Sequence, residues 1–315
     1  MADSLGIGVA KSAIDIIKGG DIVNKMTEGL GVLFPYIGIE NKAVDIYIKE
    51  IEQSDLPTKT KILLILNTKK TFKKLMNQKA IAEIAITNSK YVVGDNEKSS
   101  IQEDWLDRFM DSAGYVSSAD IQLIWGRILA NELDEPGSTP PNMIRILSEI
   151  TPKIAKAFRK ICSMTVFVFD LDETGEYNKG YRHLFVPFKE NEDLFREMEI
   201  DFSILNELEA LGVIRFDSLT GYVSKGFESK EIIVGIDGNL VMYTYSSNPG
   251  FPIGDVLLTT AGEALQSITD AVEIDGYYEM VNSYLAKKGV NSKQEPAYML
   301  EYIDGELTVK KKCVN

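Results

Sequence analysis

Two aspartates spaced two residues apart, Asp170 and Asp172, have the spacing best suited to catalysis in this chain. They follow the apolar run 167–169, which predicts a strand, and alternate residues of a strand share one face. In a magnesium-dependent phosphatase such a pair supplies a nucleophile and a general acid. That chemistry also needs a repeated βαβ sheet, a lysine and a distant acidic pair, whereas a polar turn and hairpins are expected here. We therefore expect a strand that ends in an acidic turn, and phosphatase chemistry stays the second alternative.

Residues that could support metal or cofactor chemistry are scarce. His183 is the only histidine, and the two cysteines, Cys162 and Cys313, lie far apart in sequence. A zinc site needs a cluster of such ligands. The sequence also contains no Gly-x-Ser-x-Gly elbow, no Walker-type loop and no third glycine after Gly6 and Gly8 for a dinucleotide loop. We expect no catalytic residues, no metal and no cofactor, and we favour a chain that is not an enzyme.

A run of lysines is the clearest candidate binding feature. No acid occurs between Asp55 and Glu83, and seven positive charges lie in that interval: Lys59, Lys61, Lys69, Lys70, Lys73, Lys74 and Lys79. Such a run could bind the phosphates of a nucleic acid or an anionic membrane surface. It could equally meet an acidic neighbouring subunit, or simply be the solvated face of an amphipathic helix. The sequence leaves these alternatives open.

The charge of the chain is divided unevenly along its length. The 315 residues carry 34 Lys+Arg and 47 Asp+Glu, a net charge of −13. Residues 1–95 contain 13 basic and 11 acidic side chains, which leaves 21 and 36 for residues 96–315, so the two parts carry +2 and −15. The longest apolar stretches are too short for a bilayer, which needs about 20 residues. We expect no transmembrane span, no signal peptide and a cytoplasmic location.

The first half of the chain is expected to be helical. Apolar spacing and the positions of glycine and proline predict helices over 10–17, 21–33, 41–53 and 59–88, followed by a loop over 91–100. A further helix is expected to begin at a capping box at Ser117 and to bury Trp125. Two shorter helices are predicted after Pro140 and at Thr151-Pro152.

The second half is expected to combine strands with helices. Strands are predicted over 166–169, 184–188, 214–216, 222–223, 232–236 and 240–245, with a D-G turn joining the last two. Helices are predicted over 202–213, after a capping box at Thr260, and over 277–288, with a last hairpin within 297–309. The fold class is therefore α+β, with a helical N-terminal half and a small C-terminal antiparallel sheet with helices of winged-helix character. Helix 202–213 carries acids and no base, so we expect protein contacts there and not DNA reading.

The expected domain organisation has four parts. They are a helical region over 1–95, a helical bundle over 98–165, the winged-helix-like unit over 166–290 and an extension over 291–315.

Several sequence pieces resemble a bacterial family of unknown function. The members carry a D-W segment, a W-G-(R/K)-I-L-A-x-E helix and a P-G-S turn, which correspond here to Asp104-Trp105, to 125–132 and to 136–138. Further similar pieces lie at 28–35, 200–212 and 256–263. The central helix is also similar to that of abortive-infection alpha proteins, which are implicated in phage defence. This second resemblance implies an accessory or defence protein and brings no catalytic residues.

The sequence as a whole favours an interaction protein that assembles with itself or with a protein partner. The candidate interaction residues are Trp125, Arg127, Asn131 and Glu132 of the central helix. We expect Trp125 to anchor the helix in a core, and the other three to form a polar network for a partner or a hinge, or an intramolecular salt bridge. The first alternative is binding of a nucleic acid or an anionic membrane surface through the lysine run.

Overall fold

The computed structural model describes residues 33–37, 41–90, 101–170, 180–225, 231–244, 250–293, 298–303 and 306–311. The chain divides into two compact units, Met1–Pro152 and Lys153–Asn315. The first unit is helical and the second combines helices with small antiparallel sheets, which confirms the predicted α+β class. The helix predicted over 10–17, the helix predicted over 21–33 except its last residue, and the loop predicted over 91–100 lie outside the described residues.

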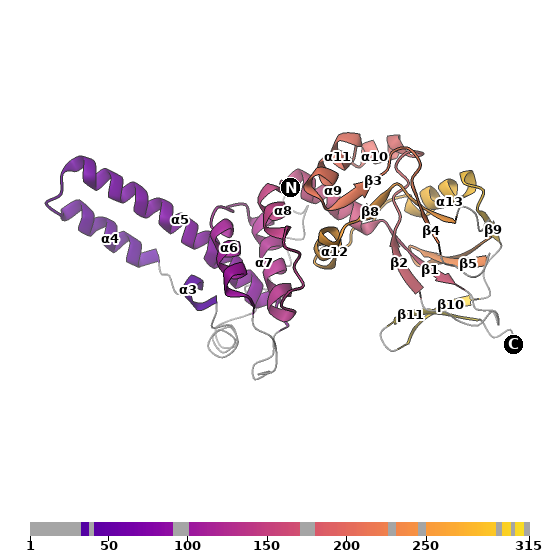
Figure 1. Ribbon diagram of the computed structural model, residues 1–315, viewed down its shortest axis with the longest axis horizontal. Helices are drawn as coiled ribbons and strands as arrows, with labels where there is room; N and C mark the ends of the chain where they lie inside the picture. The colour runs from indigo at the N-terminus through magenta and orange to yellow at the C-terminus, as the bar shows by residue number, and fades with distance from the viewer. Residues whose placement is uncertain are drawn as a thin grey trace. The chain divides into compact units, whose positions relative to one another are not determined.

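The first unit is built from a long helix and shorter helices packed along part of it. They are α3 (Phe34–Ile37), α4 (Asn41–Gln53), α5 (Thr58–Asn88), α6 (Glu103–Ala113), α7 (Ala119–Asp134) and α8 (Met143–Glu149). The helices α4 and α5 form a hairpin, because Pro57 lacks the backbone N–H that would continue α4 and fits just before a helix start. In Figure 1 the indigo and purple hairpin extends beyond α6 and α7, so these two helices lie beside only the C-terminal part of α5.

Aromatic side chains form the centre of the first unit. Phe109 of α6 lies between the two tryptophans, with ring centroids 4.8 Å from Trp105 and 4.8 Å from Trp125. Phe109 and Trp125 are fully buried. Trp105 and Phe109 lie at i, i+4 on α6, as expected of the buried stripe of an amphipathic helix, and Phe109 packs against Trp125 of α7. The prediction that Trp125 anchors a helix core is therefore confirmed by its burial.

The start of α7 corrects one detail of the predicted capping. The N-cap residue is Ser118, and its side chain makes no capping hydrogen bond. The predicted box at Ser117 is wrong because Ser117 lies one residue before the cap. Its hydroxyl instead lies 3.3 Å from the Asn77 amide nitrogen, a hydrogen-bond donor on α5.

The second unit alternates short helices and strands. Its helices are α9 (Pro152–Ser163), α10 (Glu192–Glu197), α11 (Phe202–Leu211), α12 (Thr260–Ser267) and α13 (Tyr277–Lys287). Its strands are β1 (Thr165–Asp170), β2 (Gly180–Leu184), β3 (Ile214–Phe216), β4 (Tyr222–Ser224), β5 (Glu231–Ile236), β6 (Asn239–Thr244), β7 (Phe251–Gly254), β8 (Val256–Leu258), β9 (Asn291–Lys293), β10 (Tyr298–Ile303) and β11 (Glu306–Lys311).

One antiparallel sheet forms the frame of this unit. Its strand order is β2-β1-β5-β6-β9, and three two-stranded pairs accompany it, β3–β8, β4–β7 and β10–β11. The β5–β6 turn has Asp237 at φ 46° and Gly238 at φ 76°, the left-handed pair that a two-residue hairpin requires. The predicted D-G hairpin is therefore confirmed.

Phe169, Ile233 and Val309 are fully buried and form one apolar cluster.

Two predicted boundaries in the second unit are wrong. The predicted strand over 184–188 lies instead at Gly180–Leu184, and Val186 makes only a single bridge to Gly254. The α12 cap is Thr259, whose hydroxyl accepts from Gly262 N at 3.1 Å and donates to Gly212 O at 2.6 Å, not Thr260. A threonine one position earlier caps better because it also satisfies the carbonyl at the end of α11.

Candidate docking surface

Four of the seven predicted anion-binding lysines lie on one exposed face of helix α5. At 100° per residue, seven side chains of its N-terminal half fall within an arc of about 120°. We call this arc the outer face of α5, and it consists of Lys59, Ile62, Leu63, Leu66, Lys69, Lys70 and Lys73. All seven side chains are exposed, and Leu63 is 66% exposed. The outer face therefore combines three exposed aliphatic side chains with four positive charges and no carboxylate.

The remaining three lysines of the run contact the protein itself. Lys61 Nζ donates to the Glu52 carbonyl of α4 at 2.8 Å. Lys74 pairs with Asp111 at 2.5 Å, which raises the pKa of Lys74, and its ammonium lies 4.9 Å from the centre of the Tyr115 ring. Lys79 lies 4.0 Å from Glu83, one helical turn along α5. The seven predicted lysines therefore do not form one surface.

Helix α4 covers the side of α5 that lies opposite its outer face. Ile51 of α4 is buried, and Leu64 and Ile65 of α5 are half-buried. Leu64 and Ile65 lie about 100–160° around the helix from the centre of the outer face. The exposed acids of α4, Asp45 and Glu50, consequently belong to the other side of the hairpin.

Further along α5, the same face is covered by the rest of the first unit. Asn77, Ile81 and Ile84 continue the arc of the outer face. Asn77 is buried and its amide donates to Gly114 O at 2.8 Å, and Ile81 is fully buried. A Cβ built on Gly126 of α7 would lie 2.3 Å from Ile84 Cγ2, so the two helices approach very closely there. One continuous face of α5 is thus packed at its C-terminal half and exposed at its N-terminal half.

The candidate interaction residues of α7 mostly make contacts within the first unit. Trp125 Nε1 donates to Leu147 O at 3.2 Å. The Glu132 side chain is buried, and its two oxygens accept from Gly137 N at 2.7 Å and Thr139 N at 2.8 Å. Glu132 therefore stabilises the turn that follows α7. Arg127 and Asn131 are half-buried, and an outward role for either one stays a prediction.

The acidic pair is only partly described by the structure. Asp170 is the last residue of β1 and lies opposite Ile232 of β5. Asp172 lies outside the described residues, so the structure does not test the second alternative, phosphatase chemistry. Across the described ranges, no group of three or more His, Cys, Asp and Glu side chains could hold a metal ion. His183 lies on β2, where burial lowers its pKa, and burial raises the pKa of the Cys162 thiol.

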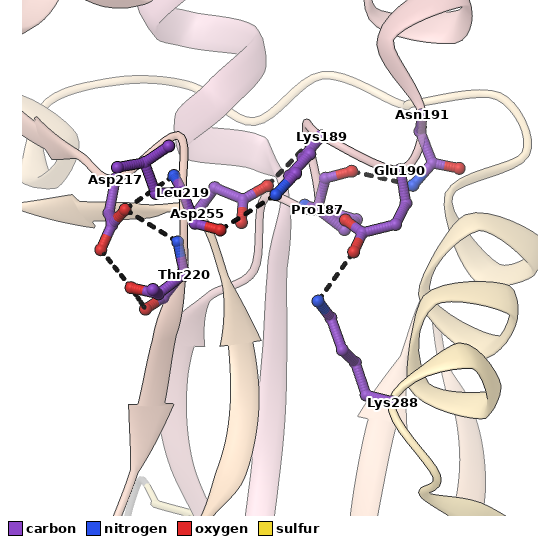
Figure 2. Close-up of polar contacts among 10 residues, drawn as sticks. Pro187, Lys189, Glu190, Asn191, Asp217, Leu219, Thr220, Asp255 and Lys288 are labelled. Carbon is purple, nitrogen blue, oxygen red and sulfur yellow. Dashed lines mark hydrogen bonds and ion pairs between the residues drawn. The ribbon is translucent and has the colours of Figure 1, made fainter.

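Figure 2 shows a polar cluster in the second unit that the sequence did not reveal. Asp255 is 2% exposed, and its carboxylate accepts from Lys189 N at 2.9 Å. Burial raises the pKa of Asp255. Beside it, Glu190 pairs at 2.7 Å with Lys288, the residue that caps the C-terminus of α13. Lys189 precedes Glu190 in the chain, so the short segment that contains both is tied to β7–β8 and to α13.

The same cluster fixes a turn between β3 and β4. The Asp217 carboxylate accepts from the Thr220 hydroxyl at 2.7 Å and from the backbone N–H groups of Thr220 and Leu219. These hydrogen bonds lower the pKa of Asp217 to about 2, and the bond from the Thr220 hydroxyl is the largest cause. Asp217 N in turn donates to Asp255 O at 2.9 Å. Because these contacts join parts of the same unit, we interpret the cluster as structural.

A hollow of about 750 Å³ lies in the first unit between α3, α6 and the segment before α8. Its polar wall includes Tyr36, whose hydroxyl lies 3.3 Å from Asp107, and Asp111, which is paired with Lys74. The hollow is widely open, and these acids have partners within the protein. It is therefore a weaker candidate than the outer face of α5.

Comparison with known proteins places the chain in a family. None of the helices among the described residues is long and apolar enough to span a bilayer. No curated protein and no solved structure matches the chain. A family described as a protein of unknown function (DUF2806) matches residues 66–282, which is more than half of the chain. The match begins within the outer face of α5 and contains α7 and, apart from Lys288, the polar cluster of the second unit. The chain therefore belongs to the DUF2806 family of proteins of unknown function.

Proposed function

We propose that this chain is a non-enzymatic interaction protein that docks onto a partner surface through the outer face of α5. The observation that carries the proposal is that one face of α5 is packed in the C-terminal half of the helix and exposed in the N-terminal half. From Asn77 onward that face is packed against α7, whereas Ile62, Leu63 and Leu66 are 52%, 66% and 52% exposed. Single exposed aliphatic residues are normal on a protein surface, but adjacent ones on one helix face favour an interaction site.

The energetics of covering these side chains are substantial. Complete burial of a Leu or Ile side chain stabilises by about 1.5–3 kcal/mol, so covering three half-exposed ones contributes roughly 3 kcal/mol. Four lysines around them would add attraction to an acidic surface. A second copy of the chain is one such surface, since residues 96–315 carry 21 basic and 36 acidic side chains. Homo-oligomerisation is therefore included in the proposal.

The second unit is proposed to have a winged-helix arrangement that serves protein contacts. Helix α11 follows α10 and leads into β3, which pairs with β8 just before α12. Asp201 caps α11 by accepting from Ile204 N at 3.0 Å, and Glu207 and Glu209 are exposed along it. These carboxylates would repel DNA phosphates. The exposed Phe202 at the start of α11 is better suited to a protein partner.

The cellular setting of the proposed interaction is the cytoplasm, and its context is bacterial defence against phage. Support for this context is the similarity of the α7 segment to abortive-infection alpha proteins. In such a setting the chain would act as an accessory protein. Binding of a nucleic acid through α5 is less favoured, because its outer face contains neither arginine nor an aromatic side chain.

The proposal predicts that the chain is part of a larger assembly in its own cells. In unclarified extracts, the wild-type chain should sediment as a species heavier than one 35.1 kDa chain. The double variant Leu63→Glu/Leu66→Glu should sediment as a single chain, because two carboxylates replace the apolar contacts. Ile46→Glu is the matched control, since Ile46 is 58% exposed but belongs to α4. A wild-type chain that sediments alone, or equal effects of both variants, would contradict the proposal.

A further inference from the structure

We infer that the partner of the outer face of α5 is an anionic lipid bilayer surface, on which the hairpin lies along α5. This inference rests on the proposed function and names the partner class. Its basis is the arrangement of two kinds of side chain within a single helix face. Aliphatic residues occupy the centre of the stripe, with Lys59 at one end and three lysines at the other.

The side chains of the outer face fit both layers of a bilayer interface, the anionic headgroups and the apolar acyl chains. Ile62, Leu63 and Leu66 can enter the boundary between headgroups and acyl chains, where an interfacial helix buries its apolar side. Lysine side chains beside them can extend their ammonium groups to lipid phosphates while their stems remain in contact with apolar surface. Basic side chains near an anionic leaflet gain attraction that falls off within a Debye length of about 8–10 Å.

The other side of the hairpin fits the same orientation. The acids Asp45, Glu50 and Glu52 are exposed on α4, which lies on the opposite side of α5 from the stripe. With the outer face turned to the lipid, these carboxylates point away from the negative surface. The charges thus determine which face of α5 turns toward the lipid. The net charge of −13 does not prevent binding, because charges far from the bilayer surface are screened.

Other partners fit the stripe less well. A nucleic acid would neutralise the lysines but would leave three aliphatic side chains facing phosphates, with no aromatic side chain available for base stacking. A second copy of the same face would bring two sets of lysines together around a small apolar patch. A bilayer is the surface that offers both anionic groups and an apolar layer within the width of one helix.

The test is flotation of the purified full-length chain with vesicles. Vesicles of equal parts phosphatidylglycerol and phosphatidylcholine should carry the wild-type chain upward, whereas vesicles of phosphatidylcholine alone should not. Binding should fall at least about tenfold when salt is raised from 50 to 500 mM, as expected of several lysine contacts. The triple variant Lys69→Glu/Lys70→Glu/Lys73→Glu should lose binding at least about tenfold.

A matched variant tests whether binding depends on the lysines of the outer face or only on the net charge of the chain. Lys49→Glu/Lys153→Glu/Lys287→Glu changes the net charge by the same amount at three exposed lysines outside the outer face. It should bind like the wild type. Leu63→Asn/Leu66→Asn should also weaken binding, and circular dichroism should show unchanged helix content in every variant.

Several results would overturn the lipid inference. One is a wild-type chain that fails to float with anionic vesicles, and another is equal loss of binding in the two triple variants. Binding of a DNA or RNA oligonucleotide through the same three lysines, without vesicle binding, would assign the stripe to nucleic acid instead. If vesicles fail while the heavy species in extracts still requires Leu63 and Leu66, the partner is a protein and the proposed docking function stands.

Discussion

Replacing Gly254 by alanine is expected to leave the second unit unable to fold. Gly254 has φ +98°, and a Cβ there would lie 2.6 Å from Val186 O, 2.7 Å from Val186 C and 2.8 Å from Val186 N. All three atoms belong to the backbone, so no side-chain rotation can relieve the contact. Positive φ alone costs about 1–2 kcal/mol for a residue with a Cβ. With the overlap added, we expect a loss above about 4 kcal/mol, close to the whole stability of many domains.

The matched control for this prediction is Gly289→Ala. Gly289 also has positive φ, +77°, but a Cβ there would meet no atom within 4 Å. Gly289→Ala should therefore cost only about 1–2 kcal/mol in the free energy of unfolding, measured by urea denaturation. If the two variants are destabilised equally, the close approach of Gly254 to Val186 does not exist as described.

The second large effect is expected at Glu132. In Glu132→Ala, the backbone N–H groups of Gly137 and Thr139 lose their carboxylate acceptor, and Thr139 is only 8% exposed. A hydrogen bond to a charged group contributes about 1.5–3 kcal/mol, and a buried donor left without an acceptor adds a desolvation cost. We expect Glu132→Ala to lower the free energy of unfolding by about 3–5 kcal/mol. Denaturation monitored by Trp fluorescence measures this, since Trp125 lies on the same helix.

Two further variants define what Glu132 does. Glu132→Gln keeps one oxygen acceptor, so it should recover part of the stability that Glu132→Ala loses. Glu135→Ala should be nearly neutral, because Glu135 is exposed and lies three residues along the chain. A fully stable Glu132→Ala variant would show that the carboxylate does not hold the turn, and would return Glu132 to the list of candidate partner contacts.

The helices of the first unit could largely be predicted from local sequence. The predicted bounds of α4 are those observed, and α5 begins one residue before its predicted start. Apolar spacing and Pro57 are local signals, which explains this agreement. The strand predicted over 184–188 failed because its apolar residues are buried by neighbouring elements and not by a period-2 pattern. Burial of that kind depends on tertiary packing.

The candidate surface could be predicted only in part for a similar reason. Helical spacing alone places Lys59, Lys69, Lys70 and Lys73 on one face. Whether that face is packed or exposed depends on where α7 ends along α5, which no local pattern encodes. The partners of Asp255 are likewise remote, since Lys189 lies 66 residues away along the chain. The sequence predicted that Glu132 joins a polar network, but it did not predict that the Glu132 carboxylate accepts hydrogen bonds from the turn after α7.

The central claim is that the outer face of α5 is covered by a partner in the cell. A membrane-permeable lysine-acylating reagent tests it directly, with modification at each lysine measured by mass spectrometry in living cells and in the purified chain. Lys69, Lys70 and Lys73 should react more slowly in cells than in the purified chain, whereas Lys49 and Lys153, exposed on other surfaces, should react equally in both. Equal rates at all five lysines would contradict the claim.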